Sequence, residues 1–168
     1  MTTVAGVHQS TVTNESTAAA DDASQLAPLG FELEVPTANL GMQVWIYVKT
    51  TEALVAGDVC KRGSSTTTIS AGKTAAAHGG LVLGVAQHAI GIRGFGFILK
   101  HGVGTVKAGA ETIDIGEAIY PSVATAGTAC EQLTISGTAG NRWATPMGVG
   151  LVDIAAAATG LAMLDCRG

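Results

Sequence analysis

Two acidic residues occupy matching positions in this 168-residue chain, each directly after a glycine in a short apolar segment. Asp58 lies in "LVAGDVCKR", residues 54–62, and Glu117 lies in "IDIGEAIYP", residues 113–121. Two carboxylates that meet beside a substrate can perform general acid–base catalysis. A Gly-acid pair is also ordinary turn chemistry, in which the carboxylate caps backbone amides. No nucleophile or base accompanies either acid, so we favour turns and keep a small ligand-binding or enzymatic β-barrel using Asp58 and Glu117 as the alternative.

Other residues that could do chemistry lack the required spacing. The four histidines form no His-x-His or His-Glu-x-x-His motif; they are His8, His78, His88 and His101. The three cysteines are widely separated and odd in number, so we expect buried, free thiols at Cys60, Cys130 and Cys166. "GIRGFGFI" and "HGVGTVKAG" match neither the dinucleotide fingerprint nor a P-loop. We therefore expect no catalytic residue, no cofactor and no metal, in a protein that is not an enzyme.

The segments around these residues have the pattern of β-strands. In "MQVWIYVK", residues 42–49, aliphatic side chains alternate with a second set that includes Trp45 and Tyr47. This alternation predicts a strand with an aliphatic core face and an amphipathic outer face. Helix signals are weak, so we expect at most one or two short helical turns.

The order of segments in the first half recurs in the second half. Matching glycines are offset by 59 residues (Gly57 and Gly116) and by 64 residues (Gly84 and Gly148). Each unit consists of a strand, a long loop, a strand, a turn and a strand, and one such unit cannot bury its own apolar face. We expect the two units to face each other and close into a barrel.

These patterns predict an all-β fold: a small β-barrel or sandwich-like body made from a duplicated three-strand unit and preceded by an extended N-terminal arm. The expected arm spans residues 1–39. The expected body spans residues 40–168, with internal units at about 40–110 and 111–168.

The N-terminal arm is acidic and poor in large apolar residues. Residues 1–41 contain five acidic residues and no Lys or Arg, whereas the remainder has a net charge of +1. Alone, such a segment cannot offset its ordering entropy by apolar burial, but it can order against a neighbour's surface. A terminus without a role is the alternative. The apolar residues that we expect to make neighbour contacts are Val4, Val7, Val12, Leu26, Leu29 and Phe31.

Composition narrows the classes of partner. Only 13% of the residues are charged and 47% are hydrophobic, which suggests that part of the surface is covered by other copies or by a partner. Nucleic acid is not expected, because phosphate contacts need clustered Lys and Arg. A membrane is not expected either, since the longest uncharged stretch, residues 74–92, is interrupted by Gly, Gln and His. Residues 1–16 show no basic region followed by an apolar block, as an export signal would, so we expect synthesis in a reducing cytoplasm.

A recurring pattern runs through residues 40–168: an apolar segment with Gly-acid, a loop, Gly-Val, and a Gly-rich strand. It is carried by "LVAGDVC", "VLGVAQHAI", "RGFGFILKHGVGTVKAG", "IDIGEAIYP", "MGVGLVDI" and "GLAMLDC". This pattern resembles the head decoration (capsid cement) proteins of tailed bacteriophages.

The resemblance implies a structural virion protein, made in the host cytoplasm, that binds the outer surface of the capsid and cements contacts between capsid subunits. Its partners would be the major capsid protein and other copies of itself, as a homotrimer or a symmetric cluster. The arm would add a strand to the capsid or to a neighbouring copy. The alternative within this class is another β-rich virion component, such as a tail or baseplate module.

Overall fold

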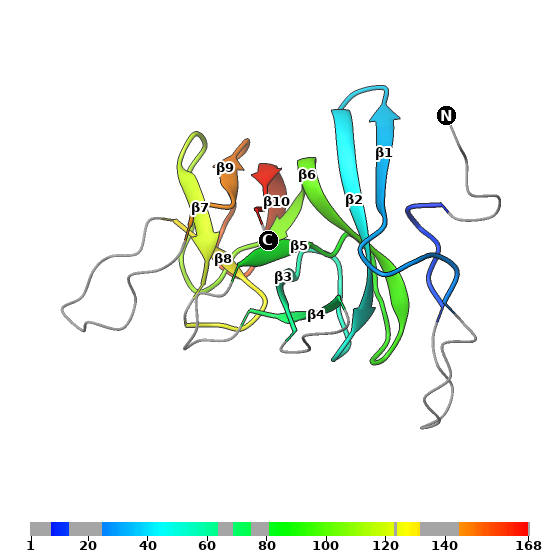
Figure 1. Cartoon of the computed structure of the whole chain (residues 1–168). Helices are drawn as coiled ribbons and strands as arrows, with labels where there is room; N and C mark the ends of the chain where they lie inside the picture. Colours follow the sequence, from blue (N-terminus) through cyan, green and yellow to red (C-terminus); the bar gives the residue numbers. More distant parts are fainter. Residues whose placement is uncertain are drawn as a thin grey trace.

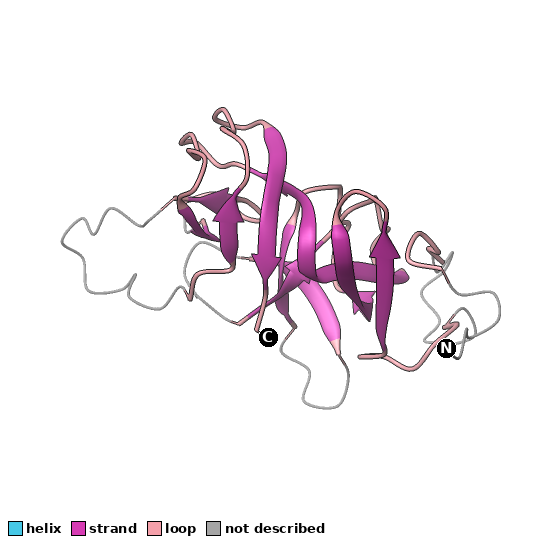
Figure 2. Ribbon diagram, turned by 90° about the horizontal axis from the view of Figure 1, so that it is seen from above, coloured by secondary structure: helices cyan, strands magenta, loops and turns pink. Residues whose placement is uncertain are grey.

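The computed structural model describes residues 8–13, 25–63, 69–74, 81–122, 124–131 and 145–167. These residues contain ten β-strands and no helix, which confirms the all-β prediction (Figure 1, Figure 2). The first five strands are β1 (Glu32–Thr37), β2 (Gly41–Thr50), β3 (Val59–Arg62), β4 (Ser70–Lys73) and β5 (Val82–Val85). The others are β6 (Phe95–Lys107), β7 (Ala118–Pro121), β8 (Ala129–Cys130), β9 (Gly148–Gly150) and β10 (Thr159–Asp165).

Five strands close into a first barrel. β2 pairs with β4, β4 with β3, β3 with β5, β5 with β6, and β6 again with β2. The β2–β4 pair is parallel and the others are antiparallel. Aliphatic side chains and one cysteine fill the interior: Ile46, Val48, Leu54, Cys60, Ala71, Leu83, Ala86, Ile90 and Ile98. Closure leaves no free sheet edge among these strands, because the backbone of each strand pairs with a neighbour on both sides.

β6 also belongs to a second, smaller ring. Its residues 101–107 pair with β10, β10 pairs with β9, β9 with β7, and β7 with β8. A parallel bridge between Ala108 and Ala129 of β8 completes this ring. Next to it, the Gly109 N–H donates to the Ala129 carbonyl at 2.8 Å. The order β8-β7-β9-β10 thus repeats the order β4-β3-β5-β6.

The repeat extends to single hydrogen bonds and dihedral angles. The isolated bridge between Leu54 and Ile90 in the first barrel has its counterpart between Ile113 and Ile154 in the second. Gly57 and Gly116 both have positive φ, at 88° and 85°. The two non-glycine residues with positive φ in the described parts of the chain also correspond: they are Arg93 and Ala157, each at 59°. The duplication inferred from the glycine offsets is therefore present in the backbone.

The arrangement of the two units differs from the expected one. They do not face each other across one barrel. Each ring consists of four strands plus the shared β6. The repeated unit itself has four strands, β3 to β6 and β7 to β10, where three were expected. The length of β6 permits this: its 13 residues span roughly 43 Å at about 3.3 Å per residue. Gly102 has φ +108° where β6 passes from one ring to the other, and a Cβ there would lie 2.7 Å from the Met42 carbonyl oxygen.

The N-terminal part of the chain folds back onto the first barrel. The expected boundary between arm and body, at residues 39 and 40, falls in the turn between β1 and β2, and β1 pairs with β2 along its whole length. Ahead of β1, the Gly30 N–H donates to the Tyr47 carbonyl and the Tyr47 N–H donates to the Phe31 carbonyl. The expected outer face of β2 is buried, with Trp45 6% and Tyr47 1% exposed.

The two equivalent glycines give a matched pair of variants. Gly57→Ala would place a Cβ 3.0 Å from the Lys107 backbone nitrogen, whereas at Gly116 nothing lies within 4 Å. Both variants incur the cost of a positive φ, about 1 kcal/mol. We expect Gly116→Ala to lower the free energy of unfolding by that amount, and Gly57→Ala to lower it by a further 1–3 kcal/mol or so from overpacking. Chemical denaturation measures both; equal losses would contradict the close approach of the Gly57 turn to β6.

Candidate functional site

Asp58 is a structural carboxylate in a tight turn. Its side chain is buried, and Oδ2 accepts a hydrogen bond from the Val55 N–H at 2.9 Å. The same oxygen lies 3.2 Å from the Lys73 Nζ, which comes from β4. The turn is closed by the Asp58 N–H, which donates to the Val55 carbonyl at 3.1 Å. Since one oxygen of Asp58 is committed to an amide and a lysine, the geometry supports the turn interpretation over the catalytic one.

Glu117 occupies the equivalent turn of the second barrel. Its N–H donates to the Asp114 carbonyl at 3.2 Å, as the Asp58 N–H does to Val55. Its side chain is exposed, however, and the Asp114 N–H is bound by the carboxylate of Glu131 instead. The two acids proposed as a catalytic pair thus stand in corresponding turns of different barrels, one buried and one exposed. Nothing in this geometry brings them to one substrate.

The three cysteines are free and buried, as expected from their spacing. Burial raises the pKa of Cys166 to about 12 and the pKa of Cys130 to about 11. Burial also raises the pKa of Cys60, the most enclosed of the three. Thiols held in the protonated form are poor nucleophiles and poor metal ligands.

Histidine chemistry is equally sparse in the described residues. His88 stacks on the Trp45 ring, with centroids 6.4 Å apart, and burial lowers its pKa. His78 lies outside the residues that the structure describes. Within the described ranges no group of three or more His, Cys, Asp or Glu side chains is arranged to hold a metal ion.

The residues expected to make neighbour contacts through the arm contact their own chain where the structure describes them. Val12 packs against the first-barrel interior, and Thr13 forms an antiparallel bridge with Phe95 at the start of β6. The N–H of each bridge residue donates to the carbonyl of the other, at 2.8 and 3.0 Å. At Thr13 the arm therefore pairs with its own chain. Contact with a second molecule stays a prediction.

The remaining arm residues are distributed as follows. Leu29 and Phe31 are partly buried against the aromatic cluster that contains Tyr47, Phe95 and Phe97. Leu26 is 45% exposed, although its N–H donates to the Tyr47 hydroxyl at 3.1 Å. Val4 and Val7 lie outside the described residues.

Sequence reasoning missed the residues that hold the two barrels together. Gln87 is the clearest example, because its side-chain amide donates to the Thr105 carbonyl and accepts from the Thr105 N–H. The side chain thus makes the two hydrogen bonds that the backbone of a neighbouring strand would make. At the same contact, the Val59 N–H donates to the Gly127 carbonyl. A glutamine after "VLGVA" carries no signal in the sequence that would identify this role.

In the described portion of the chain, no helix is long and apolar enough to cross a membrane.

The fold defines a class: an all-β protein of two small barrels in tandem, with one strand in common. No protein-family model matches the chain. A search of curated protein sequences also finds no significant match. Among solved structures, the chain is similar to the N base of the head fibre protein gp8.5 of bacteriophage phi29, with a TM-score of 0.53 and 13% identity. The match covers 74% of this chain and 95% of that one, so the two proteins share a fold.

Removing the buried carboxylate should destabilise the protein, and removing its exposed counterpart should not. We expect Asp58→Ala to lower the free energy of unfolding by about 2–3 kcal/mol, because it leaves the Val55 amide and Lys73 without their acceptor. Glu117→Ala is the matched control and should change stability by less than about 0.5 kcal/mol. Urea denaturation compares them; equal effects would show that Asp58 does not anchor its turn.

The thiols should be unreactive in the folded protein. Because burial raises all three cysteine pKa values, we expect no reaction with Ellman's reagent at pH 8 in native buffer. All three should react once the chain is unfolded in guanidinium. A thiol that titrates in native buffer would place that cysteine at an accessible surface.

Proposed function

We propose that this chain is a structural protein of a phage head, which binds the outer surface of the capsid and cements the contacts between capsid subunits. The observation that carries the proposal is the fold shared with the phi29 head fibre N base, nearly the whole of which is matched. The sequence resemblance of residues 40–168 to head decoration proteins points in the same direction. The proposed partner is the major capsid protein, and the proposed location is the virion exterior after synthesis in the host cytoplasm.

A non-enzymatic role fits the chemistry of the described residues. The Asp58 carboxylate is engaged in its own turn, and burial raises the pKa of all three thiols. The described residues contain no cluster of three or more His, Cys, Asp or Glu side chains that could hold a metal ion. What remains for function is shape and exposed surface. Weak contacts of that kind become strong when the symmetry of a shell multiplies them.

A head location is better supported than a tail or baseplate location, because the matched structure belongs to a head fibre. We propose that the chain forms a module on the head surface that is similar to the base of a head fibre.

Cosedimentation with empty, expanded capsids of the phage that encodes the protein tests this proposal. We expect saturable binding, with a stoichiometry set by the symmetry axes of the shell, and no binding to isolated tails. Unexpanded shells serve as the control for non-specific adsorption. Binding to tails alone, or to no virion part, would overturn the proposal.

A truncation separates arm contacts from body contacts. Deleting residues 2–24 removes Val12 and Thr13 but keeps residues 25–31, which cover Tyr47. The thermal midpoint reports whether the body remains folded. Weaker capsid binding by the folded truncation would assign part of the interface to the arm, and unchanged binding would assign it to the barrels.

A further inference from the structure

The second barrel exposes a surface whose counterpart on the first barrel is buried. Val85 and Leu99 lie on the outside of the first ring, are fully buried, and belong to a core cluster that continues into the second ring through Ile113, Ile119 and Ile154. Their equivalents at the 64-residue offset are Val149 and Met163, which are 40% and 42% exposed. The first barrel is thus covered by the second at this position, whereas nothing in the described chain covers the second.

More apolar side chains surround these two. Val149 is opposite Met163 in the β9–β10 pair, and the Leu151 N–H donates to the Leu161 carbonyl directly beside them. The exposed apolar residues of this surface are Ile115, Val149, Leu151, Val152, Leu161 and Met163.

The same surface carries exposed carboxylates. The turn containing Asp114 and Glu117 is tied to it, because the Gly150 N–H donates to the Glu117 carbonyl at 3.0 Å. Asp153 is tied to the same turn, since its Oδ1 accepts from the Ile115 N–H at 2.8 Å. We call these three acids and the six apolar residues above the acidic end face.

The two barrels have opposite charge. Residues 40–110 contain seven Lys and Arg and two acidic residues, a net charge of +5, whereas residues 111–168 contain six acidic residues and two Arg, a net charge of −4. Glu32 and Glu34 of β1 offset part of the positive charge, and Glu32 pairs with Lys100. Charge separation of this size within one chain favours contacts between unlike ends of different molecules.

One end of the first barrel carries two arginines and exposed apolar side chains. Arg62 of β3 is opposite Ala71 of β4, Ala71 is opposite Thr50 of β2, and the Arg93 N–H donates to the Thr50 carbonyl, so both arginines lie at one end of the ring. Exposed apolar side chains accompany them: Ile92 is 58% and Leu81 63% exposed. We call this set the basic end.

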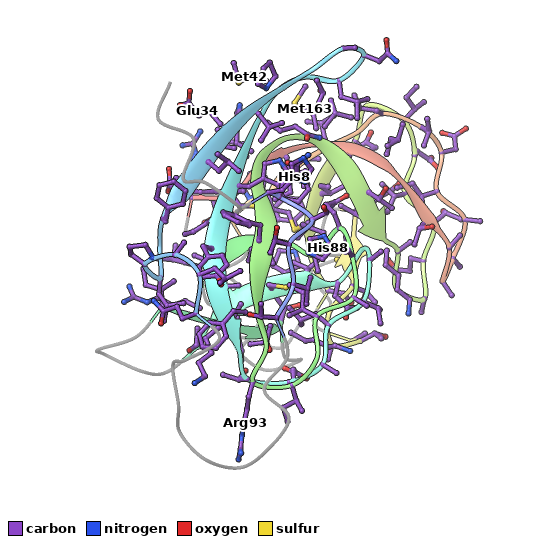
Figure 3. All side chains as sticks on the ribbon, turned by 90° about the vertical axis from the view of Figure 1, so that its right-hand side faces the viewer. His8, Glu34, Met42, His88, Arg93 and Met163 are labelled. Carbon is purple, nitrogen blue, oxygen red and sulfur yellow. The ribbon has the colours of Figure 1, made fainter. Side chains whose placement is uncertain are left out.

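The basic end and the acidic end face lie on different sides of the molecule. Arg93 lies at the bottom of Figure 3 and Met163 near the top. In Figure 1, likewise, β3 and β4 lie at the bottom and the turn preceding β7 at the top. A single molecule therefore cannot join its own two ends.

We propose that the acidic end face of one chain binds the basic end of another copy of this chain, head to tail. Apolar side chains at both ends supply the buried area, and the unlike charges set the orientation. Contact between two acidic end faces is disfavoured, because it would oppose Asp114, Glu117 and Asp153 to their own copies. A head-to-tail contact closes into a ring or continues as a chain. This proposal does not depend on capsid binding.

Light scattering of the full chain at several concentrations and ionic strengths tests the contact. We expect a mass above that of one chain at about 50 mM salt, falling toward one chain at about 500 mM, where the Debye length is only a few ångströms. A monomer at every concentration in low salt would overturn the proposal.

Paired charge reversals then test the partners. Asp114→Lys with Glu117→Lys, and separately Arg62→Glu with Arg93→Glu, should each lower the association constant about tenfold or more. An equimolar mixture of the two variants should restore association, because each then offers an end of unlike charge to the other. A mixture that stays monomeric, or an arginine variant that associates like the unmodified chain, would contradict head-to-tail binding.

Two further variants keep the test decisive. Glu34→Lys reverses a charge on β1, which belongs neither to the acidic end face nor to the basic end, and should leave the mass unchanged. If a reversal unfolds the chain, judged by circular dichroism, the neutral pairs Asp114→Asn with Glu117→Gln and Arg62→Gln with Arg93→Gln replace it. These pairs should lower association and flatten its salt dependence; unchanged salt dependence would contradict the proposal.

Discussion

The structure depends on one strand that serves two rings. β6 pairs with β2 over its first half and with β10 over its second, so that each barrel contains hydrogen bonds that only β6 can supply. At the change of partner, Gly102 allows the β2 backbone to approach more closely than any side chain would permit. Because of this sharing, the outer surface of the first ring becomes part of the core of the second. The two units are therefore a single folding body rather than two domains on a linker.

The N-terminal segment completes this arrangement at the other side of the first barrel. Residues 25–31 cover Tyr47 of β2 and β1 pairs along the edge of β2, on the side where a preceding repeat would otherwise lie. The tandem array thus has a cap at its beginning, supplied by the same chain. Repeat arrays generally need such terminal caps to hide their apolar faces. The acidic end face is the end where the described chain supplies none.

The sequence was sufficient to predict the repeat and its turns, because glycines with positive φ must recur wherever the backbone recurs. Gly57 and Gly116, and the Gly-acid turns that follow them, were therefore recognised. The distribution of strands between rings was not predicted, since it depends on long-range pairing along β6 that no local pattern encodes. The alternation in β2 predicts that Tyr47 faces outward. It is buried because residues 25–31 pack over it, and that segment has no periodicity that would predict this contact. Lys73, the partner of Asp58, ends the short strand β4, and the sequence "SAGK" gives no sign of an ion pair.

The seams that close the two rings contain different numbers of hydrogen bonds, and this affects which part of the fold opens locally. The β2–β4 seam of the first ring is held by two residue pairs, Lys49–Ser70 and Thr50–Ala71, and by the Thr51 N–H, which donates to the Ala71 carbonyl. The corresponding seam of the second ring is the single Ala108–Ala129 bridge beside a strand of two residues. Opening that seam breaks few hydrogen bonds and leaves the first barrel intact. The amide proton of Gly109 should accordingly exchange with solvent through a local fluctuation, while the amides of β2 and the first half of β6 wait for global unfolding. Sharing a strand makes the molecule one body without making it uniformly rigid.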